Sequence, residues 1–568
     1  MATVERMPPG TVRLNDASSH PSGTKHVYTA STGSLVLQPK PTDDPDDPLN
    51  WATWRKWLNY GVVLVYVLFT FTLLDIAAVA YSQLVDELGM TYQISTIATA
   101  LNFTGLAIGC VAFIPLTYRY GRRPIYLLSV TVQLVSAVWA GSVKSTNEYM
   151  AVNLVMGLGG AISETIVQIT IADLFFVHQY ATVNGIFLFM QGTGAFLGPV
   201  AAGFIVAAQG WRWMWFWNAI FLGVTLVVVV FVFEEATFIP SSADEAMANP
   251  PASSEEGFDG AADTQSKGQK GLDPLEMSRT TSLASRPVLT ARSRKPLRSR
   301  LALVTKTDAP IKHHYITPFI LLFQFPAVAY TAVTFGAVLA WFSVLISISS
   351  TRMVDPPYNF SPSDIGLLNL WPFVGQLIGA LGAGPVSDRW IQALAKRNGG
   401  IYEPEMRLWL ALFPAPLLVT GGILMFGIGI ANEAPWVLLA MGIAVFACGF
   451  SVCLDVALAY LTDSYQNVSL HSHLQSLKPD LAKLTRVIGD ALVGVVFIRN
   501  AISVIVLFCL SPWRDAVGMQ NLFVMVGIIS FLFCMVPIPL LIWGKRARVA
   551  TADKYRYYSG RQPGHRPV

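Results

Sequence analysis

Long apolar blocks separated by short polar segments fill most of the chain, beginning near residue 58. A helix needs roughly 20 mostly apolar residues to cross the ~30 Å hydrocarbon core of a bilayer. The strands of a membrane barrel are only about ten residues long and alternate in polarity, so blocks of this length predict helices. We expect twelve spans, at 58–80, 93–115, 124–143, 149–172, 183–207, 214–236, 316–347, 362–385, 407–430, 435–460, 489–510 and 520–543.

A long polar segment divides these blocks into two groups of six. It is rich in Ser, Pro, Gly and charge and cannot bury a core, which predicts a disordered linker. The predicted fold is therefore an all-α membrane protein whose twelve helices form two six-helix bundles. Its expected parts are a disordered tail at 1–57, an N-terminal bundle at 58–237, the linker at 238–315, a C-terminal bundle at 316–543 and a second tail at 544–568. The polar stretch 468–488 within the second group is interpreted either as an insertion outside the bundle or as a retained intron.

Positive charges gather in alternate loops along the chain. Arg55 and Lys56 precede the first block, and the turn after the second block, the linker and the segment after the twelfth block are basic as well. The loops between them are short and poor in Lys and Arg. Because cytoplasmic loops carry the excess of positive charge, both tails and the linker are predicted to be cytoplasmic.

Composition excludes several classes of function. Hydrophobic residues make up 53% of the 568 positions and charged residues only 13%, with a mean hydropathy of +0.49. The net charge of +4 is not arranged in a basic stripe with interleaved aromatics, so nucleic-acid binding has no support. All five cysteines lie in apolar blocks without the spacing of metal ligands, and we expect neither a metal nor a cofactor. No nucleotide-binding loop and no catalytic constellation are found, which argues against an enzyme and against transport driven by ATP.

A short turn recurs at the same place in each group of blocks. After the second block the chain reads Pro-Leu-Thr-Tyr-Arg-Tyr-Gly-Arg-Arg at 115–123, and after the eighth it reads Gly-Pro-Val-Ser-Asp-Arg at 384–389. Such recurrence is expected of a transporter built from two related bundles. The residues of these turns expected to respond to conformation are Arg119, Gly121, Arg122, Arg123, Asp388 and Arg389.

The fifth block carries a row of small residues that ends in a proline. Gly194 and Gly198 are four residues apart and share one helix face, where they permit close approach of another helix. Pro199 lacks a backbone donor and favours a bend. A bend beside a face of small residues suits a helix that moves during transport, whereas a static packing face is the alternative. The candidate residues of this block are Gly185, Gly194, Gly198, Pro199 and Gly203.

Charged and polar residues interrupt several predicted spans. An ionisable group in a span is costly unless it is paired or wetted, and is therefore a candidate for function. The three carboxylates among these residues, Asp75, Glu164 and Asp455, favour a cationic substrate or protons. Arg499 could neutralise one of them. Glu164 is interpreted either as a coupled carboxylate or as a paired structural acid. The candidates for the substrate and proton pathway are Asp75, Glu164, Gln168, Gln324, Tyr330, Asp455, Arg499 and Asn500.

Taken together, the turn at 115–123 and the glycine pattern of the fifth block resemble the drug:proton antiporter family of the major facilitator superfamily. Asp-Asp-Pro-Leu-Asn-Trp at 46–51, Asp-Leu-Phe-Phe-Val-His at 173–178 and Phe-Glu-Glu at 233–235 are similar to its fungal polyamine and multidrug branch. Two positions depart from the family pattern, since Tyr118 replaces an aspartate and Asn153 an arginine. The resemblance covers roughly residues 45–550. It implies a central site between the bundles that is exposed alternately to each side of the membrane.

The expected function is secondary active transport, with export of a small organic compound in exchange for protons. Uptake of a cationic solute such as a polyamine by proton symport is the first alternative, and a solute sensor without transport is the second. The expected partners are a small-molecule substrate, protons and the lipid bilayer, with no nucleic acid. We expect a monomeric multi-pass protein of the plasma membrane, with the vacuolar membrane as the alternative.

Overall fold

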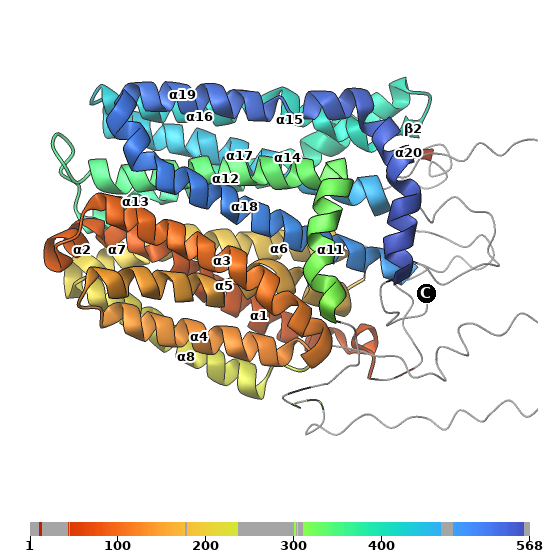
Figure 1. The fold of residues 1–568 in the computed structure, drawn as a ribbon, viewed down its shortest axis with the longest axis horizontal. Helices are drawn as coiled ribbons and strands as arrows, with labels where there is room; N and C mark the ends of the chain where they lie inside the picture. The colour runs from red at the N-terminus through yellow and green to blue at the C-terminus, as the bar shows by residue number, and fades with distance from the viewer. Residues whose placement is uncertain are drawn as a thin grey trace, which may run out of the picture.

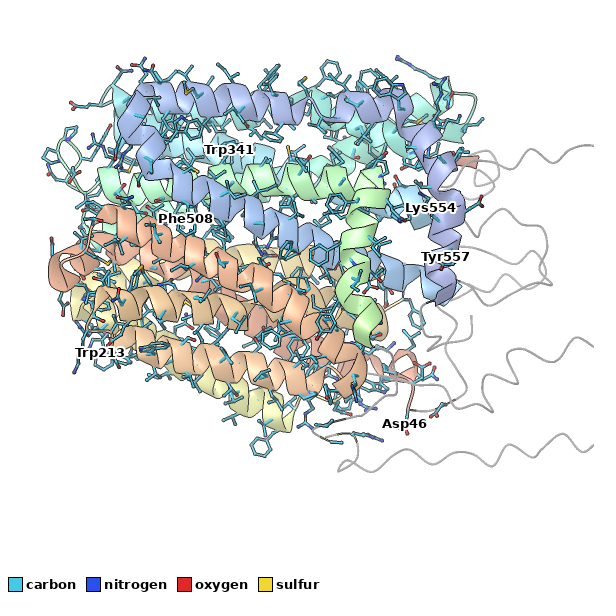
Figure 2. The ribbon with its side chains drawn as sticks, in the orientation of Figure 1. Asp46, Trp213, Trp341, Phe508, Lys554 and Tyr557 are labelled. Carbon is cyan, nitrogen blue, oxygen red and sulfur yellow. The ribbon has the colours of Figure 1, made fainter. Side chains whose placement is uncertain are left out.

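Among the residues that the computed structural model describes, twelve helical segments are long and apolar enough to cross a membrane, which confirms the predicted fold class. The structure describes residues 11–13, 44, 46–176, 179–236, 300, 302, 304, 311–466 and 481–561. The spans run side by side along the long axis of the molecule (Figure 1). Large apolar side chains such as Trp213 and Phe508 point outward and are 46% and 43% exposed, as expected of a surface that contacts lipid (Figure 2).

The described part of the N-terminal bundle contains six spans, of which Thr53–Leu88 is interrupted by a 3₁₀ turn and Thr182–Gln209 by a π turn. Helix α3 begins where the Thr91 hydroxyl accepts a hydrogen bond from the Ile94 backbone, and Ser145 caps α5 in the same way. The elements are α1 (Thr53–Asp75), a 3₁₀ turn (Ile76–Ala80), α2 (Tyr81–Leu88), α3 (Tyr92–Tyr120), α4 (Arg123–Gly141), α5 (Thr146–Leu174), α6 (Tyr180–Gly192), a π turn (Thr193–Leu197), α7 (Gly198–Gln209) and α8 (Trp211–Phe231).

The C-terminal bundle has the same number of spans and lies beside the first (Figure 1). Helices α3 and α18, and helices α7 and α13, form contacts between the two bundles. A two-stranded sheet joins β1 (Val12–Arg13) to β2 (Ile401–Tyr402). The helices are α11 (Ile311–Gln324), α12 (Pro326–Arg352), α13 (Pro362–Leu368), α14 (Leu370–Arg397), α15 (Leu408–Leu412), α16 (Pro414–Ala431), α17 (Trp436–Gln466), α18 (Leu481–Val517), α19 (Met519–Cys534) and α20 (Pro537–Arg561).

Within each bundle, a glycine brings the corresponding pair of helices into close contact. In α5, a Cβ atom on Gly157 would lie 2.0 Å from the Asn102 carbonyl oxygen of α3. In α14, a Cβ atom on Gly375 would lie 2.1 Å from the Ala444 carbonyl oxygen of α17. The second and fourth spans, and likewise the eighth and tenth, therefore pack backbone against backbone. Small residues are the usual means of such packing in a membrane, where association gains little from the hydrophobic effect.

Two of the predicted spans differ in the structure. The expected seventh span, 316–347, breaks at Phe325, because Pro326 has no backbone N–H and forces the residue before it into an extended conformation. The span itself is α12, while α11 runs across the end of the molecule (Figure 1). The expected turn at 384–389 is absent, since α14 continues through it and ends only before Gly399 and Gly400, which both have positive φ. The chain therefore makes its turn about ten residues later than predicted.

Ordered structure also extends beyond the predicted domain boundaries. Residues 46–52 were expected in a disordered tail, but Asp47 caps a 3₁₀ turn (Pro48–Asn50) and Lys56 Nζ donates to the Leu49 carbonyl oxygen over 2.8 Å. Helix α18 begins at Leu481, so the last part of the predicted insertion 468–488 is helical and continuous with the eleventh span. Helices α11 and α20 likewise extend into the predicted linker and C-terminal tail.

Candidate functional site

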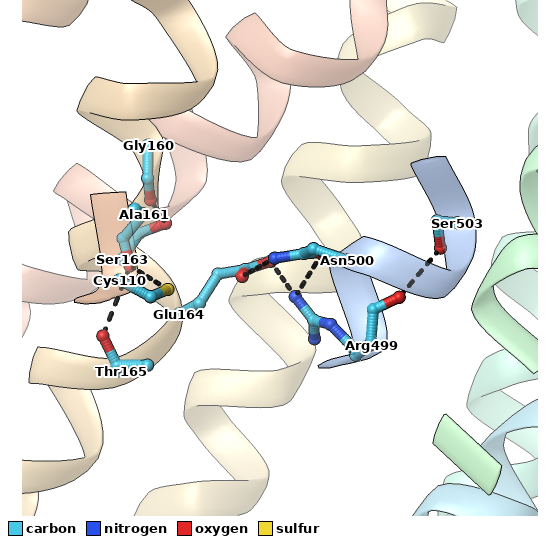
Figure 3. A network of polar contacts seen from close by, with 9 residues as sticks. All are labelled: Cys110, Gly160, Ala161, Ser163, Glu164, Thr165, Arg499, Asn500 and Ser503. Carbon is cyan, nitrogen blue, oxygen red and sulfur yellow. Dashed lines mark hydrogen bonds and ion pairs between the residues drawn. The ribbon is translucent and has the colours of Figure 1, made fainter. Parts of the chain in front are cut away.

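A buried ion pair joins the two bundles near the middle of their spans. Arg499 Nη2 on α18 donates to Glu164 Oε1 on α5, and Asn500 Nδ2 donates to Glu164 Oε2 over 3.2 Å (Figure 3). The side chains of Glu164 and Arg499 are each only 5% exposed, and Asn500 is fully buried. Three of the predicted pathway residues, from opposite halves of the sequence, thus form one polar network.

The close approach of α12 to α18 positions the arginine. A Cβ atom on Gly336 would lie 2.6 Å from Ile502 Cδ1 and 3.1 Å from the Arg499 Cα atom, so glycine is needed at this crossing. The neighbouring residue, Phe335, places its ring 4.6 Å from the Arg499 guanidinium carbon. Ser503 Oγ also donates to the Arg499 carbonyl oxygen over 3.2 Å, one turn along the same helix.

The electrostatics of this pair depend on its surroundings. Removing each ion from water costs several kcal/mol, and mutual attraction offsets this only when further hydrogen bonds are made. Asn500 supplies one such bond to Glu164. Within the described residues, however, Arg499 Nε is buried without a hydrogen-bond partner. The guanidinium is therefore held by one carboxylate, one amide and one aromatic ring, and loss of the carboxylate charge would remove its largest source of attraction.

The other two predicted carboxylates have a different environment. Asp75 ends α1, is exposed, and lies close enough to Glu164 for the two charges to interact. Asp455 lies half-buried on α17 in the other bundle. In the part of the chain that the structure describes, neither carboxylate forms an ion pair or hydrogen bond. Among the described residues, each bundle therefore carries one candidate carboxylate, Asp75 or Asp455, without an ion-pair partner.

The remaining pathway candidates lie outside the network of Glu164, Arg499 and Asn500. Tyr330 is buried on α12 and packs edge-to-face against Tyr460, with ring centroids 5.9 Å apart. Trp341, three turns further along the same helix, is also buried. Gln168 lies half-buried one turn from Glu164. Gln324, expected on the seventh span, is the last residue of α11 instead.

Three of the four candidate glycines of the fifth span lie close to another helix. A Cβ atom on Gly194 would lie 2.4 Å from the Leu68 carbonyl oxygen, and one on Gly198 would lie 2.8 Å from Thr72 Cγ2, so both face α1. Gly203 approaches Pro362 and α13 of the other bundle. Gly185 has no atom within 4 Å of such a position. Pro199 stands in the first turn of α7, directly after a π turn that includes Gly194.

The first predicted loop motif forms a network at the end of the molecule where α11 lies, called the α11 end below. Arg122 Nη2 lies 2.5 Å from Asp173 Oδ2, and the backbone N–H groups of Arg122 and Arg123 donate to the Glu235 carboxylate over 3.1 and 2.9 Å. Gly121 has a φ of +90°, and a Cβ atom there would lie 2.6 Å from Glu235 Oε2. Arg119 is exposed beside the Tyr120 ring.

Sequence reasoning missed the matching network in the other bundle. Asp388 and Arg389 are exposed on α14 and form no ion pair with any other described residue. Arg407 Nε instead donates to Asp463 Oδ2 over 2.6 Å, and Tyr402 Oη donates to the same oxygen. Arg548 forms a two-point contact with Glu405 at 2.8 and 2.7 Å. The available signal was the shared position of Asp173 and Asp463 at the ends of the fourth and tenth spans.

A second contact between the bundles involves the residue that replaces the loop aspartate of the family pattern. Tyr118 on α3 stacks on His314 of α11, with ring centroids 4.3 Å apart and planes 17° from parallel. His314 Nδ1 lies 3.2 Å from Asp490 Oδ2 on α18, and both side chains are nearly fully buried. No group of three or more His, Cys, Asp or Glu residues suited to a metal occurs among the described residues.

Comparison with known proteins decides the family. The model of the Major Facilitator Superfamily matches residues 62–470. The chain belongs to this superfamily. An uncharacterised MFS-type transporter of Schizosaccharomyces pombe is 29% identical over 96% of this chain and 94% of its own length. Protein HOL1 of Saccharomyces cerevisiae is 26% identical over 96% of each chain. The MFS transporter cpaT of Aspergillus oryzae is 25% identical over 74% of this chain and 77% of its own length.

A solved structure shows the same fold. The proton:xylose symporter XylE, bound to 6-bromo-6-deoxy-D-glucose, covers 87% of this chain and 96% of its own, with a TM-score of 0.53 and 12% identity. This major facilitator protein is thus a multi-pass membrane protein and a secondary transporter of small molecules, a class of proteins that are not enzymes.

Proposed function

We propose that this major facilitator protein exports a small organic compound in exchange for protons, as a member of the drug:proton antiporter branch. The observation that carries the proposal is the buried pair of Glu164 and Arg499, which links the two bundles between α5 and α18. A titratable group that bridges both moving parts of a transporter can couple its protonation to their relative position.

In the proposed cycle, a proton and Arg499 compete for Glu164. With Glu164 ionised, the attraction to Arg499 holds the two bundles together at this level. When Glu164 binds a proton, its charge disappears and the carboxyl keeps only neutral hydrogen bonds, which are roughly half as strong as charge-assisted ones. The bundles can then move apart at this level. Return of the proton to water on the other side restores the pair and completes the exchange.

The structure of the fifth span supports the antiporter branch. Its glycines allow the π turn at Thr193–Leu197 to pack directly against α1, which carries Asp75 at its end. A π turn interrupts the regular hydrogen-bond pattern of the α-helix around it and is often found at functional sites. The turn therefore provides a place where the span bends while its two ends keep their contacts.

The unpaired carboxylates favour a second candidate, the proton-coupled uptake of a cationic solute such as a polyamine. Asp75 and Asp455 lie one in each bundle and have no counter-charge among the described residues. A solute with two amino groups could neutralise both. This candidate uses the same proton site and differs from the first in the direction of transport.

We propose that the α11 end of the molecule faces the cytoplasm. The start of α1 and the end of α20 both lie at the α11 end (Figure 1). Arg119, Arg389, Lys545 and Arg546 are exposed in the turns and helix ends that belong to this side. The positive-inside rule makes this the cytoplasmic side, with both tails inside. We propose the plasma membrane as the site of action.

The test is transport by cells that express the protein, with and without a proton uncoupler. The panel contains spermidine, ethidium and a neutral fungicide. Wild type is expected to lower the intracellular amount of at least one compound, and both the uncoupler and Glu164→Gln are expected to abolish this. Glu148→Gln is the matched control, because Glu148 is an exposed acid at the far end of the same helix.

Each other outcome replaces the proposal in a defined way. Accumulation of spermidine that depends on the proton gradient establishes the uptake candidate. Export that survives Glu164→Gln refutes the role of this carboxylate. Binding of a panel compound to purified protein without any flux indicates a sensor.

A further inference from the structure

The Arg499 guanidinium has a second partner, in its own bundle. Its central carbon lies 4.6 Å from the centroid of the Phe335 ring, and Phe335 is half-buried on α12. Gly336, the next residue, allows α12 and α18 to approach until the ring and the guanidinium meet. A cation within about 6 Å of an aromatic face is attracted by the ring quadrupole, and more strongly where water is excluded.

The need for this ring depends on the charge of Glu164. Arginine stays protonated in proteins, so it cannot escape burial by losing its charge. While Glu164 is ionised, it balances the guanidinium. Once Glu164 is protonated, Arg499 keeps only a neutral hydrogen bond to that carboxyl. Its other partners in the described chain are the Asn500 Oδ1 atom, at 3.5 Å, and the Phe335 ring. Among the same residues, Arg499 Nε has no hydrogen-bond partner that could offset the loss of the carboxylate charge.

We propose that Phe335 is a positioning residue that holds the Arg499 guanidinium during the part of the cycle in which Glu164 is protonated. The inference rests on the proton-binding role of Glu164 given above. The ring lowers the free energy of the protonated state, in which the buried arginine has no other carboxylate of the described chain within ion-pair distance. Phe335 thereby sets the pH range in which the bridge between the bundles opens.

A packing role and this positioning role differ in one measurable respect. If Phe335 only fills space, its removal costs the same stability whether or not Glu164 is charged. If the ring holds a cation, its removal costs more when Glu164 is neutral. The substitution Glu164→Gln imitates the neutral state, so a double-mutant cycle separates the two roles.

The first experiment measures thermal unfolding midpoints of the purified full-length protein in detergent at pH 7.5. Phe335→Leu is expected to lower the midpoint by about 1–3 °C more in the Glu164→Gln background than in wild type. Phe335→Tyr, which keeps the aromatic face, is expected to show no such excess. Phe342→Leu is the control on the same helix, since its neighbours include Phe196, Phe446 and Phe450, and its loss should be additive with Glu164→Gln.

Equal losses for Phe335→Leu in both backgrounds would overturn the proposal. If Phe335→Leu gives no folded protein, Phe335→Met replaces it in the same cycle, because methionine keeps most of the volume and lacks the ring.

The second experiment measures ethidium flux in proteoliposomes as a function of pH, at a constant pH difference across the membrane. The flux profile of Phe335→Leu is expected to move to lower pH by about 0.5–1 unit, and that of Phe335→Tyr to match wild type. An unmoved profile in Phe335→Leu contradicts the proposal. If wild-type flux itself does not depend on pH, the proposed proton coupling fails, whereas the unfolding cycle still decides whether Phe335 holds Arg499.

Discussion

At the α11 end, each bundle joins its third span to its fourth through one arginine–aspartate pair, and the two pairs have different surroundings. In the N-terminal bundle Arg122 meets Asp173, which is 25% exposed, and Glu235 binds the backbone N–H groups at the start of α4. In the C-terminal bundle Arg407 meets Asp463, which is 8% exposed and also accepts a hydrogen bond from Tyr402.

The two bundles use different contacts to stabilise the start of their third span. Glu235 acts on the backbone, so the start of α4 keeps its hydrogen bonds whatever side chain stands at position 122. The second bundle relies on side chains throughout, with Glu405 bound by Arg548 and Asp463 by Arg407. Removing one charge from a buried pair leaves the other uncompensated, which is costly. Related bundles therefore share an architecture and differ in their tolerance of substitution.

The largest expected effect comes from removing each arginine in turn. Arg407→Ala should lower the unfolding free energy by about 3 kcal/mol, because Asp463 is left buried without its cation. Arg122→Ala should cost only about 1–2 kcal/mol, because Asp173 is reached by water and Glu235 still caps α4. Unfolding midpoints in detergent provide the measurement, and a greater loss for Arg122→Ala would reverse the comparison.

An intermediate effect is expected from the tyrosine that distinguishes the C-terminal pair. Burial, together with the negative charge of Asp463, raises the pKa of Tyr402 above its ordinary value. The neutral phenol therefore contributes stability in full below about pH 10, the pKa of tyrosine in an unfolded chain, and loses it as the pH rises further. Tyr402→Phe should cost about 1 kcal/mol at pH 8 and lessen the loss of stability between pH 10 and 11. An unchanged alkaline profile would show that the pKa of Tyr402 is the same in the folded and unfolded chains.

The smallest effect is expected at the rim of the same network. Lys545 Nζ lies 2.6 Å from Glu403 Oε1, but the two side chains are 54% and 22% exposed. Exposed pairs contribute about 0–1 kcal/mol, so Lys545→Ala should shift the midpoint by less than a third of the shift for Arg407→Ala. Comparable shifts would mean that location in this bundle, rather than burial, sets the cost.

The sequence predicted the spans well because each is a local feature of hydropathy. It also identified Glu164, Arg499 and Asn500 as residues of interest, since charge inside an apolar block is visible at once. Their pairing was not predictable, because Glu164 and Arg499 are separated by 335 positions and periodicity does not tell which spans are neighbours. The break at Phe325 was accessible in principle from Pro326, but the apolar run on both sides concealed it.

Other features could not be predicted from the sequence because they arise only when distant segments are brought together in the fold. The turn predicted at 384–389 was inferred from recurrence, whereas the helix ends where Gly399 and Gly400 permit positive φ. The Arg407 network escaped notice because it consists of ordinary loop and helix-end residues that acquire meaning only when α17 and the segment before α15 are brought together. Tyr118 was recognised as a departure from a pattern, yet its stacking on His314 required the unforeseen position of α11.

The π turn at Thr193–Leu197 has a consequence for the phase of the fifth span. A π turn accommodates one residue more than an α turn, so everything after it is rotated by about 100° relative to an uninterrupted helix. Gly198 and Gly203 both lie beyond the turn, in α7, where they face α1 and α13 of the other bundle. Deleting one residue within the turn would leave α6 in register and rotate both glycines away from these partners. The single extra residue therefore sets which faces of α7 meet α1 and the other bundle.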